Sequence, residues 1–406
     1  MKIVQINATC GVGSTGKICL GVSQLLAAEN IENHVFFSDK SSGYELGIRC
    51  SNRRYIKWQA LKSRLLGNYG FNSQRATKRI ISELKSIKPD IVHLHNIHGH
   101  DCHLGMLFGY FKETKTKVIW TFHDCWAFTA YCPHFTMMQC NKWQSGCASC
   151  PQSKEFSWLW DKSEWLYQKK KLLLSDIDLT IVTPSHWLKN LVGQSFLREH
   201  PCMVIHNGID LAVFSPKESH FREQHQLKNK IIVLGVAFGW GARKGLDVFV
   251  ELAKRLDEQY QIILVGTDDK VDEHLPPNII SIHRTQNQQE LAEIYSAADV
   301  FVNPTREENY PTVNMEALAC GTPVVTFRTG GSPEMLDETC GAIVRYNDAE
   351  ALEKEIVRIC TENPFSTEQC LKKSREFDMH ARFQEYVKLY QSIRVESDQA
   401  EQTTIS

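Results

Sequence analysis

Short apolar runs alternate with longer stretches of helical periodicity along most of the chain. Runs at 2–8, 117–124, 231–236 and 299–302 each lead into a loop that contains glycine or polar residues. Apolar runs of this length, separated by helical patterns, are typical of parallel strands joined by crossover helices. The alternation stops in a polar segment at 211–229 and then starts again. The pattern therefore predicts two α/β domains joined by a linker.

The expected domain boundaries follow from these changes in pattern. We predict an N-terminal domain at residues 1–205 and a C-terminal domain at residues 206–375. A helix is expected at 376–393, followed by a polar, disordered tail at 394–406. A chain of 406 residues with 42% apolar residues is long enough to form two real cores.

Charge and hydropathy narrow the classes of function. The net charge of −1 predicts no general affinity for nucleic acid. No apolar run approaches the length of a membrane span, and the opening residues lack the apolar core of a signal peptide. We therefore expect a cytoplasmic protein whose contact with the inner face of the cell membrane is at most peripheral.

The stretch 301–326 carries the strongest chemical signal. An apolar run ends in Asn303-Pro304, a helical pattern begins near Pro311, and Gly321 closes it before the next apolar run. A helix N-terminus is thereby expected at the carboxyl end of a parallel strand, where α/β folds bind anionic ligands. Two carboxylates, Glu308 and Glu316, mark this turn.

The spacing Glu-x7-Glu, followed by Ala-Leu-Ala-Cys-Gly-Thr-Pro-Val-Val, resembles the signature of family 4 of the retaining glycosyltransferases. The resemblance implies a GT-B architecture, with two Rossmann-like doubly wound domains facing a cleft. It also implies that the last helix crosses back to the N-terminal, acceptor-side domain. The segment 123–151 is similar to a subset of the family that builds bacterial surface polysaccharides such as capsule, exopolysaccharide or O-antigen.

The activity that this resemblance implies is a retaining, hexosyltransferase-type reaction. A sugar would move from a UDP or GDP sugar to a hydroxyl of a saccharide or of a lipid-linked glycan. The departing phosphate would itself take the proton of the acceptor, so no protein base, metal or other cofactor is needed for catalysis. The alternative is a sugar-nucleotide-binding protein without turnover.

The resemblance also assigns roles to individual residues. Glu316 would accept hydrogen bonds from the ribose hydroxyls, and His123 and Glu308 would act at the donor sugar as catalytic residues. Lys244 would bind the donor phosphates; many relatives have an arginine six residues earlier, where this chain has Phe238, so Arg243 is the expected substitute. The donor-binding residues predicted in this way are Gly13, Ser14, Arg243, Lys244, Glu308, Asn309, Tyr310, Thr312 and Glu316.

Near the N-terminus, Gly11-x4-Gly16-Lys17 imitates a phosphate-binding P-loop. That motif needs Ser or Thr at the next position to hold magnesium, and this chain has Ile18. A nucleoside-triphosphatase is therefore disfavoured. A glycine-rich turn before a helix can still present backbone N–H groups to a diphosphate.

Two histidines follow apolar runs, at the expected ligand edge of a parallel sheet. His123 ends the run at 117–124, and His95 ends an earlier run at 90–96. A role in the site is favoured over a structural role for His123, and the two roles are equally open for His95.

Four cysteines lie on one long loop between about residues 125 and 151, namely Cys132, Cys140, Cys147 and Cys150. A loop of this length in a compact domain needs something to fix it. Four thiolates can close a tetrahedral zinc site, so structural zinc is the favoured interpretation. Free thiols are the main alternative, and an iron–sulfur cluster is another. A zinc-ribbon nucleic-acid binder is disfavoured, because only Lys142 and Lys154 lie near the cysteines.

The stretch from Arg49 to Lys88 contains eleven cations and one acid, Glu83, with Trp58 and Leu61 interleaved. This composition suits a surface for anionic lipid or for a phosphate-bearing acceptor. A solvated helical face fits the pattern equally well.

Overall fold

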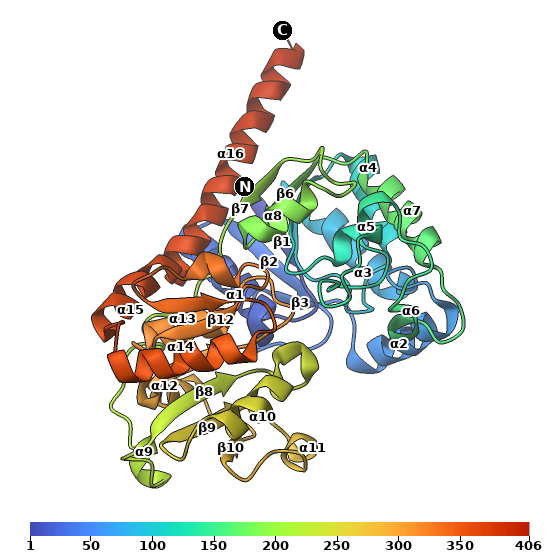
Figure 1. The fold of residues 1–406 in the computed structure, drawn as a ribbon. Coiled ribbons are helices and arrows are strands. Elements are labelled where there is room, and N and C mark those ends of the chain that lie inside the picture. The colour runs from blue at the N-terminus through green and yellow to red at the C-terminus, as the bar shows by residue number, and fades with distance from the viewer. Residues whose placement is uncertain (406) are drawn as a thin grey trace. The chain divides into compact units, whose positions relative to one another are not determined.

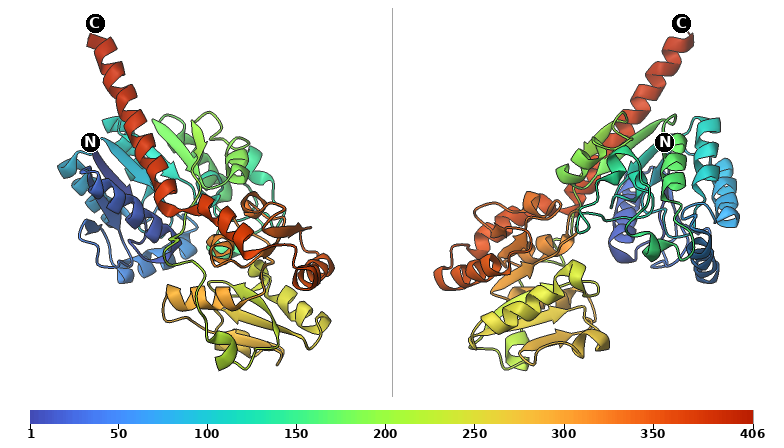
Figure 2. Two further views of the ribbon diagram at one scale, coloured as in Figure 1. Left: turned by 90° about the vertical axis from the view of Figure 1, so that its left-hand side faces the viewer. Right: turned by 45° about the vertical axis from the view of Figure 1, so that its right-hand side comes forward.

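The computed structural model describes residues 1–405, with the side chains of residues 1–395. The chain divides into two compact units. Unit 1 comprises Met1–His206 together with His380–Ser406, and unit 2 comprises Asn207–Met379. Each unit is a parallel sheet with helices on both faces (Figure 1; Figure 2).

Unit 1 contains a seven-stranded sheet in the order β3-β2-β1-β4-β5-β6-β7. Every paired neighbour in it is parallel. The chain moves outward from β1 to β3, returns to the other side of β1 and then moves outward to β7. The strands are β1 (Lys2–Ile6), β2 (Glu32–Phe37), β3 (Gly47–Arg49), β4 (Ile91–Leu94), β5 (Lys117–Thr121), β6 (Leu179–Thr183) and β7 (Cys202–Val204).

The helices of unit 1 lie between these strands and at the end of the chain. They are α1 (Gly13–Ala28), α2 (Arg53–Leu66), α3 (Gln74–Ile87), α4 (Leu104–Thr114), α5 (Lys142–Ser145), α6 (Ser153–Phe156), α7 (Ser163–Leu174), α8 (His186–Val192) and α16 (Met379–Ile405), with the 3-10 turn η1 (Trp126–Phe128).

Unit 2 repeats the doubly wound plan with six strands in the order β10-β9-β8-β11-β12-β13. These strands are β8 (Ile231–Val236), β9 (Tyr260–Val265), β10 (Ile279–Ile282), β11 (Val300–Asn303), β12 (Val324–Phe327) and β13 (Gly341–Val344). Its helical segments are α9 (Phe221–Gln224), η2 (Ala242–Lys244), α10 (Leu246–Arg255), α11 (Asp269–Asp272), α12 (Gln288–Ala297), α13 (Thr312–Ala319), η3 (Ser332–Met335), α14 (Ala349–Glu362), α15 (Thr367–Ser374) and η4 (Arg375–Phe377).

Alternation along the strands builds two apolar layers in unit 2. Ile232 and Leu234 of β8 face a core that α12 and α13 cover, whereas Val233 between them faces a core that α10 and α14 cover. Because successive side chains of a strand point to opposite faces, a strand buried on both faces is apolar throughout. This confirms the predicted fold class, and all four apolar runs named above are strands at the expected places.

The C-terminal helix α16 packs on unit 1. Tyr386 and Tyr390 are fully buried, and the ring of Phe383 lies against Gly21 of α1, where a Cβ would come within 2.3 Å of it. The polar composition after residue 393 predicts a disordered tail, but the backbone of α16 stays helical to Ile405.

Candidate active site

Two loops meet at the carboxyl edge of the unit 2 sheet. The chain reverses its direction across this sheet between β8 and β11, so the loops that follow these strands are neighbours. The backbone N–H of Arg306 donates to the carbonyl oxygen of Arg243 at 2.8 Å. Gly245 has φ +76°, and a Cβ there would lie 2.4 Å from the carbonyl oxygen of Pro304, so glycine permits this approach. Open α/β sheets bind their ligands at such a switch point.

Lys244 and Glu308 form an ion pair at this point. Lys244 ends η2, directly before α10, and Glu308 lies in the loop after β11. The ammonium donates to the carboxylate, and each side chain is 19% exposed. The first backbone N–H groups of the ten-residue helix α10 follow Lys244 and add partial positive charge. Both residues are predicted from the sequence as donor-binding residues, and the structure brings them together.

Arg306 is a cation at this edge that the sequence analysis missed. It is 9% exposed and makes a bidentate ion pair with Asp247 at 2.7 Å, while its Nε donates to Asn347 Oδ1 at 2.8 Å. It also donates to the carbonyl oxygen of Ala242 at 2.6 Å. Arg306 therefore holds the turn that carries Lys244, whereas the expected substitute cation, Arg243, is an exposed residue of that turn.

The loop that carries Glu308 is held by the turn after β12. The backbone N–H of Gly331 donates to the carbonyl oxygen of Asn309 at 2.7 Å. Gly330 has φ +55°, and a Cβ there would lie 1.8 Å from the carbonyl oxygen of Glu308. Asn309 and Tyr310 are each 5% exposed. Packing and glycine together therefore fix the backbone on both sides of the Glu308 side chain.

Glu316 lies inside α13, the helix that follows this loop. Tyr295 of α12 is fully buried, and its hydroxyl donates to Glu316 Oε2 at 3.1 Å. Asn303 at the end of β11 donates to Asn314 at 2.7 Å and ties the helix to the strand. Thr312 is the first residue of the helix. Tyr295 therefore orients the carboxylate of Glu316, the residue that is predicted to bind the ribose.

In unit 1 the corresponding switch point lies between β1 and β4. The side chain of Asn7 links the two loops, because its Oδ1 accepts from the backbone N–H of Asn96 at 3.1 Å. Gly13, at φ +72°, and Ser14 begin α1 and are exposed. Ile18 points into the protein and is 6% exposed. The loop thus presents the predicted residues Gly13 and Ser14, and the position where a P-loop needs a hydroxyl is buried and apolar.

Three histidines gather under the same edge of unit 1. His95 Nδ1 lies 3.1 Å from His123 Nε2, and His95 Nε2 lies 3.1 Å from Gln5 Oε1. His93 Nε2 lies 2.8 Å from the hydroxyl of Thr121. Burial lowers the pKa of His95 well below its ordinary value and lowers the pKa of His123 to about 4. Both rings are therefore neutral near pH 7, and His95 contacts His123 directly.

His98 and Asp124 form a second pair beside these histidines. His98 Nε2 lies 2.9 Å from Asp124 Oδ2, and Asp124 Oδ1 accepts from the backbone N–H of Trp126 at 2.9 Å. Burial alone would lower the pKa of His98, but the charge and hydrogen bond of Asp124 raise it above 6.5. Burial would raise the pKa of Asp124, but His98 and the Trp126 N–H lower it to about 2.

These shifts predict a pH window for the stability of unit 1. The contribution of Asp124 is present above its ordinary pKa of 3.8 and is lost as the pH falls through about 2. The contribution of His98 is present below 6.5 and is lost as the pH rises through its raised pKa. Asp124→Asn should therefore lower the free energy of unfolding by about 2 kcal/mol at pH 5 and by less at pH 9. Urea unfolding at the two pH values measures this, and an equal loss at both would show that the pair is not ionic.

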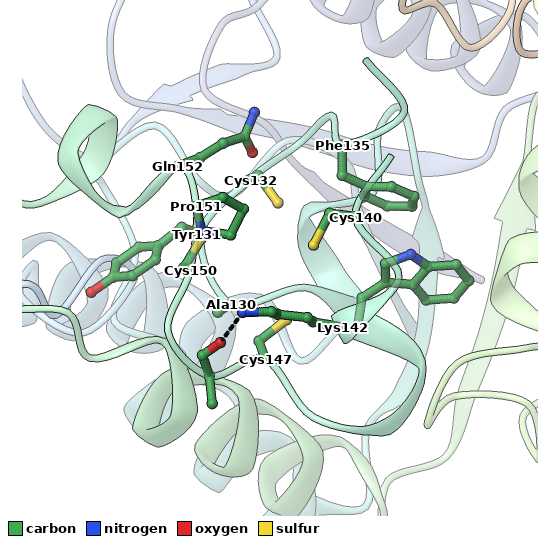
Figure 3. A pocket seen from close by; sticks show the side chains of 12 residues that line it. Ala130, Tyr131, Cys132, Phe135, Cys140, Lys142, Cys147, Cys150, Pro151 and Gln152 are labelled. Atoms are coloured by element: carbon green, nitrogen blue, oxygen red, sulfur yellow. Dashed lines mark hydrogen bonds between the residues drawn. The ribbon is translucent and has the colours of Figure 1, made fainter. Parts of the chain in front are cut away.

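The four loop cysteines line one pocket, shown in Figure 3. The pocket is also lined by Phe135, Trp143 and Lys142, whose ammonium donates to the carbonyl oxygens of Ala148 and Ser149. All fourteen cysteines of the chain are free thiols. Within the described residues, no group of three or more His, Cys, Asp or Glu side chains is arranged to hold a metal ion. The structure thus does not support the predicted zinc site, and the four cysteines line the pocket without disulfide bonds.

The long loop is fixed by burial and by Lys170. This lysine of α7 is 1% exposed, and its ammonium donates to the carbonyl oxygens of Trp126, Thr129 and Ala130 at 2.7, 3.0 and 3.2 Å. It also lies 3.5 Å from the centroid of a Trp126 ring. Tyr131 is fully buried beside these residues. The hydrogen bonds from Lys170 to backbone carbonyl oxygens and the aromatic packing therefore hold the loop in place, which is the role predicted for a metal.

The basic stretch forms α2 and α3, and the surface of α2 is both basic and apolar. Trp58 is 62% exposed on it. The backbone N–H of Trp158 donates to the carbonyl oxygen of Arg64 at 2.7 Å, so the segment 157–160 lies beside the end of α2, where Figure 1 places α2 next to α6. This segment adds Trp160, which is 61% exposed. None of the helices in the described part of the chain combines the length and apolar character needed to cross a bilayer.

Two Rossmann-like units, each a parallel sheet with loops gathered at its switch point, are the architecture of the GT-B glycosyltransferases, and solved structures agree. The fold is similar to that of sucrose-phosphate synthase from Thermosynechococcus elongatus, with a TM-score of 0.71 at 18% identity, covering 97% of this chain and 99% of that one. It is also similar to HepE from Anabaena, solved in complex with UDP-glucose, with a TM-score of 0.67 at 14% identity, covering 97% and 100%.

The sequence places the chain within this class. The family model described as Glycosyltransferase Family 4 matches residues 16–213, and the model described as Glycosyl transferases group 1 matches residues 228–362. The chain belongs to the group 1, family 4 glycosyltransferases, which confirms the predicted family and enzyme class. It is 23% identical to an Escherichia coli K12 protein named as a colanic acid biosynthesis glycosyl transferase, WcaC, over 85% of this chain and 87% of that protein.

Proposed function

We propose that the protein transfers a sugar from a nucleoside diphosphate sugar to a hydroxyl of a saccharide or lipid-linked glycan, with retention of anomeric configuration. The observation that carries this proposal is the Lys244–Glu308 pair at the switch point of unit 2. A cation at a helix N-terminus suits a diphosphate, and a carboxylate next to it suits the hydroxyls of the attached sugar.

The reaction would break the bond between the anomeric carbon and the diphosphate and form a bond from that carbon to the acceptor oxygen. The departing phosphate oxygen would take the proton of the acceptor hydroxyl, so no protein base is required. Lys244, Arg243 and the N–H groups of α10 would stabilise the negative charge that develops on the leaving group.

The remaining predicted residues complete the proposed donor site. In unit 2, Glu316 would bind the ribose, and Glu308 would bind the sugar together with Asn309, Tyr310 and Thr312. In unit 1, His123 would contact the sugar, and Gly13 and Ser14 would offer backbone N–H groups to the diphosphate or face the acceptor.

The relative from E. coli supports a bacterial surface polysaccharide as the product, in line with the capsule, exopolysaccharide or O-antigen expected from the sequence. A structural neighbour solved with UDP-glucose supports a nucleotide sugar as the donor.

A panel of UDP and GDP sugars tests the function. At least one should stabilise the protein thermally and should be hydrolysed slowly without an acceptor, including in the presence of EDTA. Stabilisation without hydrolysis, and without transfer to any added lipid-linked glycan, would favour the alternative of a non-catalytic sugar-nucleotide-binding protein. Retention is read separately, from the anomeric configuration of the product.

We also propose that unit 1 contacts anionic lipid through α2, in the cytoplasm at the inner face of the cell membrane. The face of α2 combines the exposed Trp58 with cations, and the neighbouring segment 157–160 adds two exposed tryptophans. Tryptophan favours the lipid headgroup region, and each cation near an anionic surface contributes about 1 kcal/mol. Such a contact would bring a lipid-linked acceptor to the enzyme.

Binding to lipid vesicles is expected to depend on the cations of α2. The protein should bind anionic but not neutral vesicles at low salt and should dissociate as salt rises. Reversing Arg53, Arg54 and Lys57 to glutamate should abolish binding without changing donor affinity. The matched control reverses three exposed cations of unit 2, namely Lys254, Lys270 and Lys372. An equal loss of vesicle binding in both triple variants would indicate an effect of net charge alone. If the wild type does not bind anionic vesicles, α2 is a solvated face or a site for a soluble anionic acceptor.

A further inference from the structure

A chain of hydrogen bonds, buried at Gln5 and His95, runs through the unit 1 sheet to His123. It begins at the carbonyl oxygen of Cys19 in α1, which accepts from Gln5 Nε2 at 3.0 Å. Gln5 Oε1 lies 3.1 Å from His95 Nε2, and His95 Nδ1 lies 3.1 Å from His123 Nε2. Gln5 is fully buried in β1, and His95 is 1% exposed. Gln5 is also the polar residue among the apolar residues Ile3, Val4 and Ile6 of β1.

The Cys19 carbonyl determines the direction of every bond in this chain. A carbonyl oxygen can only accept, so the amide nitrogen of Gln5 must face it and the amide oxygen must face His95. That oxygen can also only accept, so His95 Nε2 carries a proton. The reversed amide would place two oxygens against each other and leave buried polar groups unsatisfied, which costs about 1–3 kcal/mol each.

The protons on the two histidines then follow. A neutral imidazole carries one proton, so His95 Nδ1 has a lone pair and accepts. His123 Nε2 must therefore donate to it. In neutral His123 the other ring nitrogen, Nδ1, consequently carries a lone pair. The rings lie nearly parallel, with an interplanar angle of 15° and centroids 5.4 Å apart, which matches one shared hydrogen bond between them.

We propose that Gln5 and His95 are positioning residues that hold neutral His123 in the tautomer with its proton on Nε2, so that Nδ1 accepts a hydrogen bond from a sugar hydroxyl. The tautomer follows from these hydrogen bonds and from the neutral state of both rings, and the sugar hydroxyl rests on the proposed function. A hydroxyl donates readily to such a nitrogen, and the opposite tautomer would place an N–H donor toward it. The relay thereby selects the orientation of a hydroxyl, as second-shell partners do for ligating histidines.

Two variants of Gln5 separate this role from simple packing. Gln5→Met removes the acceptor for His95 and keeps the approximate size of the side chain. Gln5→Glu restores the relay, because a buried, protonated carboxyl can donate to the Cys19 carbonyl and accept from His95. Ser23→Ala is the matched control, since the Ser23 hydroxyl is buried in α1 and bonds Asn33 instead of the histidines.

The experiment is two-bond ¹H–¹⁵N NMR of the full chain labelled at histidine, with His95→Gln and His123→Gln used for assignment. The wild type, Gln5→Glu and Ser23→Ala should each show His123 protonated at Nε2 only. Gln5→Met should show both tautomers. A wild-type His123 protonated at Nδ1, or a Gln5→Met spectrum identical to wild type, would overturn the proposal.

The functional arm uses the UDP or GDP sugar that the wild type turns over in the panel above. Gln5→Met should lower kcat/KM roughly three- to tenfold, which is the loss of one hydrogen bond, and Gln5→Glu should recover it. Affinity for the free nucleoside diphosphate should not change. If no nucleotide sugar is turned over, the proposed function fails, while the tautomer measured without ligand still decides the relay.

Discussion

Replacing Lys244 with methionine is expected to lower the rate of glycosyl transfer about 100- to 1,000-fold, the usual effect of removing one group that stabilises developing negative charge. Lys244 precedes the N-terminus of α10, where its charge and the helix N–H groups would act on the same anion under the proposed function. The leaving diphosphate gains charge in the transition state, so kcat should fall more than the affinity for the donor falls. Steady-state kinetics with the donor identified by the panel measure both.

The control for this variant is Lys254→Met, which removes an exposed cation from the other end of α10. It should change kcat less than twofold. Because Lys244 also pairs with Glu308, the unfolding midpoint of each variant is measured alongside. A folded Lys244→Met protein with wild-type kcat would remove Lys244 from the proposed mechanism.

Glu316→Gln is expected to weaken binding of the nucleoside diphosphate roughly ten- to a hundredfold. A carboxylate that accepts hydrogen bonds from two ribose hydroxyls forms charge-assisted bonds, and losing one costs about 1.5–3 kcal/mol. The fold should survive, because the amide keeps the shape of the carboxylate and still accepts from Tyr295. Isothermal titration with UDP and GDP measures the change.

Tyr295→Phe is the companion variant, since it removes only the hydroxyl that donates to Glu316 at 3.1 Å. It should weaken binding by a smaller factor than Glu316→Gln, because the carboxylate stays in place but loses its orienting partner. If Glu316→Gln binds UDP and GDP as tightly as the wild type does, Glu316 does not bind the ribose, whatever the result for Tyr295→Phe.

The apolar runs and helical patterns along the chain were sufficient to predict its two α/β units. The apolar run at 231–236 coincides with β8, and the run at 117–124 contains β5. Both are buried on two faces, and such strands are apolar throughout, which a sequence displays directly. Lys244, Glu308 and Glu316 were also predicted from the sequence, because the motifs that contain them resemble those of family 4.

Interactions between distant segments were not readable in the same way. Arg306 pairs with Asp247, 59 residues away, and a single arginine in a polar loop gives no sign of such a partner. The four cysteines suggested a metal because their spacing fits one, yet the loop is fixed by Lys170, a residue of α7 that a sequence shows only as one more helical cation.

The sequence by itself thus determined the two α/β units, because these depend on periodicity along the chain, and its resemblance to family 4 identified the family and the candidate site residues. Only the tertiary structure decided what each site residue touches. Gln5 lies in β1, whereas His95 and His123 follow the ends of β4 and β5. Their contact depends on β1, β4 and β5 being neighbours in the sheet. A hydrogen bond needs its two atoms within about 3 Å, and sequence patterns do not specify a distance between segments.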